Sequence, residues 1–200
     1  MLLNLEKNRQ RLFALDAGLR AEADRMLEQS GLGRIIREEG FKPAGSYTMN
    51  VMTWCELDFE RSDNKPDLKK HWELGKRFLQ NDWVWGLRYV DASRDPRTPG
   101  DEGFYWRLEA TNPRGGEIWL IDLWTARQEV FERSAPKRPL WMSKLNDDFR
   151  YDILSIKEVV CKLPEYRKSI HSWHIYEAVL ENGIKSVDEF WDWWKKNYGK

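Results

Sequence analysis

Apolar residues recur at helical spacing over the first thirty residues, where Leu12, Leu19 and Met26 are separated by charged positions. This spacing predicts an amphipathic helix, because residues three, four or seven apart share one face of a helix. Gly31 and Gly33 follow the last apolar position and are expected to end the helix. The first element is therefore predicted to be a long helix with one buried stripe.

A different periodicity covers the stretch Thr53–Arg61, in which apolar and polar residues alternate. Its odd positions include Leu57 and Phe59, and its even positions include Glu56 and Asp58. Successive side chains of a strand point to opposite faces of a sheet. We therefore predict a strand with one apolar face and one acidic face.

The remaining elements follow from the same two periodicities. Helices are predicted over residues 67–79, 126–135, 147–161 and 171–180, with a last helix capped by Ser186. Strands are predicted over residues 83–91, 104–111 and 117–124, and the turn at 112–116 should join two of them as an antiparallel hairpin. The pattern predicts an α/β (α+β) fold, with a mixed sheet flanked by helices over residues 1–140 and a helical bundle over residues 141–200.

Composition narrows the class of protein. The 200 residues carry 33 basic and 33 acidic side chains, a formal net charge of zero, which disfavours a long nucleic acid as the partner. No apolar run reaches the length of a membrane helix, and the first residues lack the pattern of a signal peptide. Cys55 and Cys161 lack the spacing of zinc ligands, so we expect a cytoplasmic protein without membrane association.

One constellation suggests chemistry. The turn Gly45-Ser46 precedes Glu56 and Asp58, which point to the same face of the predicted strand. Two such carboxylates repel each other unless a cation lies between them, and Mg²⁺ is commonly held by carboxylates together with substrate phosphates. A Gly-Ser turn can place backbone N–H groups and a hydroxyl against a phosphate.

Asp122 adds a third carboxylate, because it interrupts the apolar run of a later predicted strand. An ionised carboxylate is costly in apolar surroundings unless it is paired or binds a metal. Asp122 is therefore a candidate metal ligand and a candidate acceptor for the proton of an attacking hydroxyl. The alternative is that Glu56 and Asp58, like Glu60, only form the solvated face of a strand.

The order of Gly45-Ser46, the pair Glu56 and Asp58, and a later acidic strand residue resembles the nucleotidyltransferase superfamily. That family includes DNA polymerase beta, CCA-adding enzymes and antibiotic nucleotidyltransferases, and the resemblance covers roughly residues 34–125. It implies that Gly45 and Ser46 bind the nucleotide, that Glu56, Asp58 and Asp122 hold Mg²⁺ or Mn²⁺, and that Asp58 and Asp122 are catalytic. Glu56 departs from the family pattern, which usually has Asp at this position.

Several other residues have both a possible functional role and a structural one. Lys157 lies close to the apolar stripe of its helix and is a candidate nucleotide-binding residue. The alternative is that its stem packs while its ammonium reaches water. Arg88 and Arg107 are placed to neutralise phosphates or to pair with Glu109 or Asp91. Most of the 12 tryptophans are expected in the core, and Trp54 shares the face of the acidic pair.

Two functions follow from this reading. The first is a metal-dependent nucleotidyltransferase that moves a nucleoside monophosphate from ATP or another nucleoside triphosphate to a hydroxyl of a small acceptor. The alternative is a catalytically inactive protein of the same fold that binds nucleotide, a ligand or a protein partner. The aromatic stripe of the last helix predicts a bundle core, or a homodimer or partner surface if it is exposed.

Overall fold

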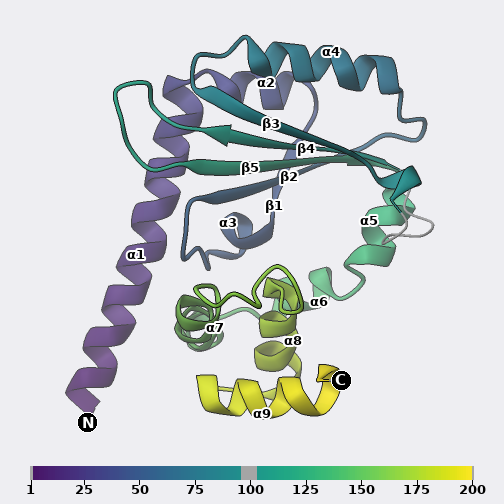
Figure 1. The fold of residues 1–200 in the computed structure, drawn as a ribbon. Coiled ribbons are helices and arrows are strands. Elements are labelled where there is room, and N and C mark those ends of the chain that lie inside the picture. Colours follow the sequence, from purple (N-terminus) through teal and green to yellow (C-terminus); the bar gives the residue numbers. More distant parts are fainter. Residues whose placement is uncertain (1, 96–102, 200) are drawn as a thin grey trace. The chain divides into compact units, whose positions relative to one another are not determined.

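The computed structural model describes residues 2–95 and 103–199. In chain order the elements are α1 (Leu2–Gln29), α2 (Leu32–Glu38), β1 (Lys42–Ala44), α3 (Gly45–Met49), β2 (Glu56–Ser62), α4 (Leu68–Leu79), β3 (Val84–Asp91), the 3-10 helix η1 (Ala92–Arg94), β4 (Gly103–Ala110), β5 (Trp119–Ala126), α5 (Gln128–Ser134), α6 (Arg138–Lys144), α7 (Asp147–Val160), α8 (Ser172–Asn182) and α9 (Val187–Tyr198) (Figure 1). The fold is mixed α+β with helices at the C-terminal end, as the sequence predicted. Among the described residues, no helix is both long and apolar enough to cross a membrane.

The chain forms two compact units, each assembled from separate stretches of sequence. One unit comprises Met1–Gly18, Asn50–Thr53 and Lys137–Lys200, and the other comprises Leu19–Met49 and Trp54–Pro136. Helix α1 therefore contributes its first part to the helical unit and its last part to the sheet unit. A single boundary near residue 140, as predicted from the sequence pattern, does not describe the contribution of α1 and of Asn50–Thr53 to the helical unit.

The sheet unit is organised by a five-stranded sheet in the order β1-β2-β5-β4-β3 (Figure 1). Strands β2 and β5 are parallel, whereas every other neighbouring pair is antiparallel. The hairpin predicted across residues 112–116 is the β4–β5 pair. The parallel pairing is what brings β2 beside a strand that lies more than fifty residues later in the chain.

One face of this sheet carries the apolar core of the unit. Its buried side chains include Leu57, Phe59, Trp106, Leu108, Ile121 and Leu123. Helix α4 packs on β3 and β4, where the His71 ring stacks on Trp106 with ring centroids 5.1 Å apart. A Cβ at Gly75 would lie 2.5 Å from Trp106 Cζ2, so this close approach of helix and sheet requires glycine.

The helical unit is held together by α7, α8 and α9, which contact one another pairwise. Ile153, Ile156 and Val160 of α7 are fully buried, as their helical spacing predicted. On α9 the predicted stripe is only partly covered, because Phe190 is buried while Tyr198 is 36% exposed.

Short elements account for the differences from the predicted pattern. Gly33 does not end a helix but lies inside α2, which begins at Leu32 directly after the left-handed residue Gly31. Strand β1 has only three residues, including Pro43, and lies at the sheet edge, where the missing N–H of proline is tolerated. Segments of three to seven residues show too few repeats for periodicity to identify them.

Candidate functional site

The carboxylates predicted to be catalytic lie side by side on the face of the sheet opposite the apolar core. Asp58 of β2 pairs in register with Asp122 of β5, which pairs with Arg107 of β4. The row extends to both edge strands, because Ala44 pairs with Asp58 and Arg88 pairs with Arg107. Two carboxylates and two guanidinium groups therefore follow each other across the sheet. We call the side chains of Asp58, Asp122, Arg107 and Arg88 the charged row, which ends beside Ala44 at the β1 edge.

The Gly45-Ser46 turn begins where β1 ends, next to the charged row. Gly45 has a φ of 63°, a left-handed conformation that favours glycine. A Cβ at this position would lie only 2.0 Å from Asp58 Oδ2, so the Gly45 backbone lies directly against the carboxylate. The structure thus brings together two sequence-predicted features, the turn and the acidic strand, that are separated by more than ten residues.

Arg107 binds Asp122 at two points in the charged row. Its Nε and Nη2 donate to the two carboxylate oxygens of Asp122 at 2.7 and 2.6 Å, in a two-point geometry. The hydrogen bond to Asp122 raises the pKa of Arg107 further above its ordinary value, against the effect of burial. Burial, and after it the charge of Asp122, raises the pKa of Tyr105 on the same strand. The site therefore combines a fixed cation with a neutral phenol.

Glu56 lies two residues before Asp58 on β2, on the same face of the strand, and has Trp54 and Arg107 as neighbours. Trp54 Nε1 donates to Glu56 Oε2 at 2.8 Å, and Arg107 Nη2 lies 3.8 Å from Glu56 Oε1. The Glu56 side chain is 15% exposed and that of Asp122 is 10% exposed. The indole predicted to share the acidic face therefore orients one of its carboxylates.

The donor set fits a hard divalent cation in its chemistry, since Glu56, Asp58 and Asp122 offer carboxylate oxygens. Across residues 2–95 and 103–199, however, no group of three or more His, Cys, Asp or Glu side chains is arranged to hold a metal ion. Both oxygens of Asp122 accept hydrogen bonds from Arg107. Three-carboxylate ligation would require Arg107 to release Asp122.

Two other predicted residues have different surroundings. Ser46 is 5% exposed and lies in α3, next to Gly45. Lys157 belongs to the helical unit, is 1% exposed, and donates from Nζ to the Val51 carbonyl at 3.0 Å. The ammonium of Lys157 therefore does not reach water, which differs from the prediction of a packed stem with a solvated ammonium. A backbone carbonyl accepts a hydrogen bond from it instead. Nucleotide binding by Lys157 stays a prediction.

The partner of Arg107 across the β4–β5 hairpin depends on where the turn is centred. In a two-stranded hairpin, residues at equal distance from the centre of the turn face each other, and the β4–β5 register pairs Ala110 with Trp119 and Arg107 with Asp122. The predicted turn 112–116 is centred on Arg114 and would place Arg107 opposite Ile121. The observed partner, Asp122, is neither Glu109 nor Asp91, and it follows only from the register that the structure shows.

No protein-family model matches this chain, and no curated protein matches it either.

Proposed function

We propose that this protein is a metal-dependent nucleotidyltransferase that transfers a nucleoside monophosphate from ATP or another nucleoside triphosphate to a hydroxyl of a small acceptor. The observation that carries the proposal is the contact between the Gly45 backbone and the Asp58 carboxylate, beside Asp122. A turn suited to phosphates and adjacent carboxylates suited to a cation are the two parts that phosphoryl-type transfer needs in one place. The resemblance of the motif order to the nucleotidyltransferase superfamily supports the same function.

In the proposed reaction, the acceptor hydroxyl attacks the α-phosphorus and the bond to the pyrophosphate oxygen breaks. Gly45 and Ser46 contact the phosphates, and Asp122 orients the hydroxyl or takes its proton. Glu56 and Asp58, joined by Asp122 when Arg107 leaves it, would hold Mg²⁺ or Mn²⁺, which supplies neutralisation of phosphate charge when bound. Arg107, once it has left Asp122, would bind a phosphate of the nucleotide instead, because a planar guanidinium binds phosphate as well as carboxylate.

A substitution of Asp58 provides the test. Asp58→Asn keeps the size of the side chain and removes its charge, so we expect pyrophosphate release to fall by about a thousandfold, since charge neutralisation and positioning supply most of such catalysis. The assay is pyrophosphate release with each nucleoside triphosphate across a panel of hydroxylated acceptors, including aminoglycosides, sugars and nucleosides. Glu60→Gln is the matched control, because Glu60 lies on the same strand and the same face.

A catalytically inactive nucleotide-binding protein is the second candidate, and the Arg107–Asp122 pair favours it. A carboxylate held at both oxygens by Arg107 is already neutralised without metal or substrate. This candidate predicts that ATP binds, with a dissociation constant unaffected by Mg²⁺, and that no acceptor releases pyrophosphate. Acceptor-dependent pyrophosphate release by the native protein that Asp58→Asn abolishes would exclude it.

A further inference from the structure

A separate cavity lies on the other face of β2, away from the charged row. It has a volume of about 470 Å³ and is lined by residues of α1, α2, β1, α3 and β2. Phe59 contributes from β2, and this residue points to the face opposite Asp58. A volume of this size falls within the range of roughly 300–1,000 Å³ that is typical of small-molecule sites.

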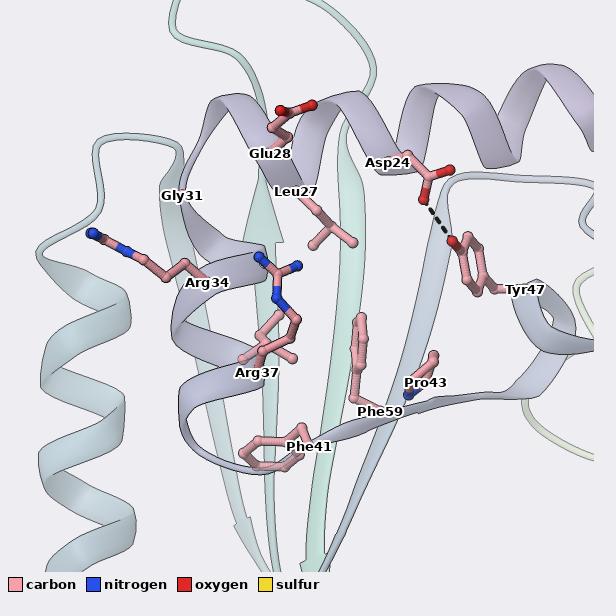
Figure 2. A pocket seen from close by; sticks show the side chains of 12 residues that line it. Asp24, Leu27, Glu28, Gly31, Arg34, Arg37, Phe41, Pro43, Tyr47 and Phe59 are labelled. Atoms are coloured by element: carbon pink, nitrogen blue, oxygen red, sulfur yellow. Dashed lines mark hydrogen bonds between the residues drawn. The ribbon is translucent and has the colours of Figure 1, made fainter.

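The floor of the cavity is apolar. Figure 2 shows Leu27 of α1 and Phe59 of β2 directed toward each other, with Phe41 and Pro43 below them. Ile36 of α2 also lines the cavity. Aromatic and aliphatic side chains from four elements thus enclose a space that favours an apolar body.

Arg37 is the cation that faces this apolar floor. In Figure 2 its guanidinium extends over the cavity toward Leu27, whereas the Arg34 side chain points away from it. A Cβ at Gly33 would lie 3.3 Å from Arg37 Nη1 and 3.1 Å from Leu27 Cβ. Because Gly33 has no side chain, Arg37 and Leu27 can both approach the backbone there. Arg37 joins no ion pair within the described part of the chain, whereas Arg34 pairs with Glu38 at 4.0 Å.

The acidic residues of the rim are directed elsewhere. Tyr47 Oη donates to Asp24 Oδ1 at 2.6 Å, and this hydrogen bond, followed by burial, raises the pKa of Tyr47 to about 12. In Figure 2 the Glu28 carboxylate points away from the cavity. The charge that faces the apolar space is therefore the positive charge of Arg37.

We propose that this cavity is a binding site for a small amphipathic organic acid, with its aromatic or aliphatic body against Leu27 and Phe59 and its anionic group on Arg37. A carboxylate, sulfonate or phosphate matches the two-point donor geometry of a guanidinium. Pro43 and Tyr47 lie on either side of the Gly45-Ser46 turn in the sequence, so the occupant contacts the segment that carries the turn. The site is distinct from the charged row, and its existence does not depend on the proposed transferase activity.

The probe for this site is 8-anilinonaphthalene-1-sulfonate, an apolar anion whose fluorescence rises on binding. Arg37→Gln should weaken its binding about tenfold, because hydrogen bonds to a charged group contribute more than neutral ones. Arg34→Gln is the matched control. Arg34 also lines the cavity, but its guanidinium points away from it in Figure 2, so the loss of this charge should change the affinity less than twofold. The neutral probe N-phenyl-1-naphthylamine, which has a similar body without the sulfonate, should bind all three proteins equally.

A substitution that reduces the volume of the cavity tests whether the probes bind inside it. Leu27 is half-buried, so we expect Leu27→Phe to fold and to weaken both probes by reducing the space between α1 and β2. Equal effects of Arg37→Gln and Arg34→Gln on the sulfonate would overturn the proposal, since they would indicate general electrostatic attraction. Absence of binding to the native protein, or affinities that Leu27→Phe leaves unchanged, would overturn it as well. Unchanged circular dichroism of each variant shows that the comparison concerns folded protein.

Discussion

Two groups of charged side chains, one in each unit, differ in what they contact. In the helical unit, Asp16, Arg150 and Lys157 surround the segment Asn50–Thr53, and we call these three residues the charged clamp. In the sheet unit, the charged row places Asp58 beside Asp122, and Glu56 lies two residues before Asp58 on β2. The first group contacts irregular backbone, whereas the second brings together carboxylates of two neighbouring strands.

The charged clamp satisfies a stretch of irregular backbone. Asp16, which is fully buried, accepts from Met52 N–H at 2.8 Å, and Arg150 donates to the Asn50 carbonyl at 3.1 Å and to Asp16 at 3.4 Å. Lys157 donates to the Val51 carbonyl. Buried backbone groups outside a helix or sheet need such partners, so each charge has a structural task.

The charged row shows the opposite arrangement. Carboxylates that face each other on neighbouring strands repel, and this costs stability unless a cation intervenes. Arg107 supplies that cation for Asp122, and its distance of 3.8 Å from Glu56 places the two groups in looser contact. The charged row holds carboxylates of neighbouring strands beside the Gly45 turn, whereas the charged clamp contacts backbone groups of Asn50–Thr53.

The largest expected effect concerns the charged clamp. Asp16→Ala leaves the Arg150 guanidinium and the Met52 N–H without their buried partner, so we expect a loss of about 3–5 kcal/mol in the free energy of unfolding. Urea denaturation followed by circular dichroism measures it. A loss under about 1 kcal/mol would contradict the view that this group of charges is structural.

Gly45→Ala tests the close contact beside the charged row. The new Cβ would require a left-handed alanine and would displace the Asp58 carboxylate, for a combined cost of about 2–3 kcal/mol and loss of transferase activity. Gly40→Ala is the control, because Gly40 has a φ of 78° and nothing within 4 Å of its Cβ position. Equal unfolding free energies for the two variants would show that Asp58 does not fill this space.

Asp122→Asn should separate activity from stability. The substitution removes one hydrogen-bonded charge from Arg107 and also removes the repulsion with Asp58, so the expected loss of stability is only about 1 kcal/mol. Pyrophosphate release should nevertheless fall at least a hundredfold, since Asp122 is a proposed catalytic group. A loss of stability as large as that of Asp16→Ala would show that the two groups of charges do not differ.

The smallest expected effect is a pH dependence at Asp152, in the same helix as Arg150 and Lys157. Burial raises the pKa of Asp152 from its ordinary value to about 6, unlike a carboxylate held by a close cation. Between about pH 4 and pH 6, Asp152 is deprotonated in the unfolded chain but still protonated in the folded protein, so the free energy of unfolding falls as pH rises. Because solvent screens this half-buried group, we expect a decrease of about 1 kcal/mol.

Thermal unfolding of the native protein and of Asp152→Asn across this range measures the difference. The asparagine variant should show a shallower decrease in melting temperature between pH 4 and pH 6. Superimposable pH profiles would mean that Asp152 ionises as it does in the unfolded chain.

Long periodic segments were predictable because side-chain burial repeats along them. Helix α7 begins at Asp147, as predicted, and the three later strands lie within three residues of their expected positions. The segments that periodicity missed are short, and β1 and α3 meet at Gly45, whose left-handed φ is a single-residue feature. Local pattern could not place them because their conformation depends on neighbouring strands.

The mixed α+β class, the acidic face of β2 and the hairpin that pairs β4 with β5 were predictable from the sequence, because they follow from alternation and from turn position. The position of Asp58 beside Asp122 was not, since β2 and β5 pair in parallel across a long stretch of chain. The tertiary structure also brings Gly45 to Asp58 and Lys157 to the Val51 carbonyl. Contacts between distant segments depend on how the elements pack, and this information is not contained in any local pattern.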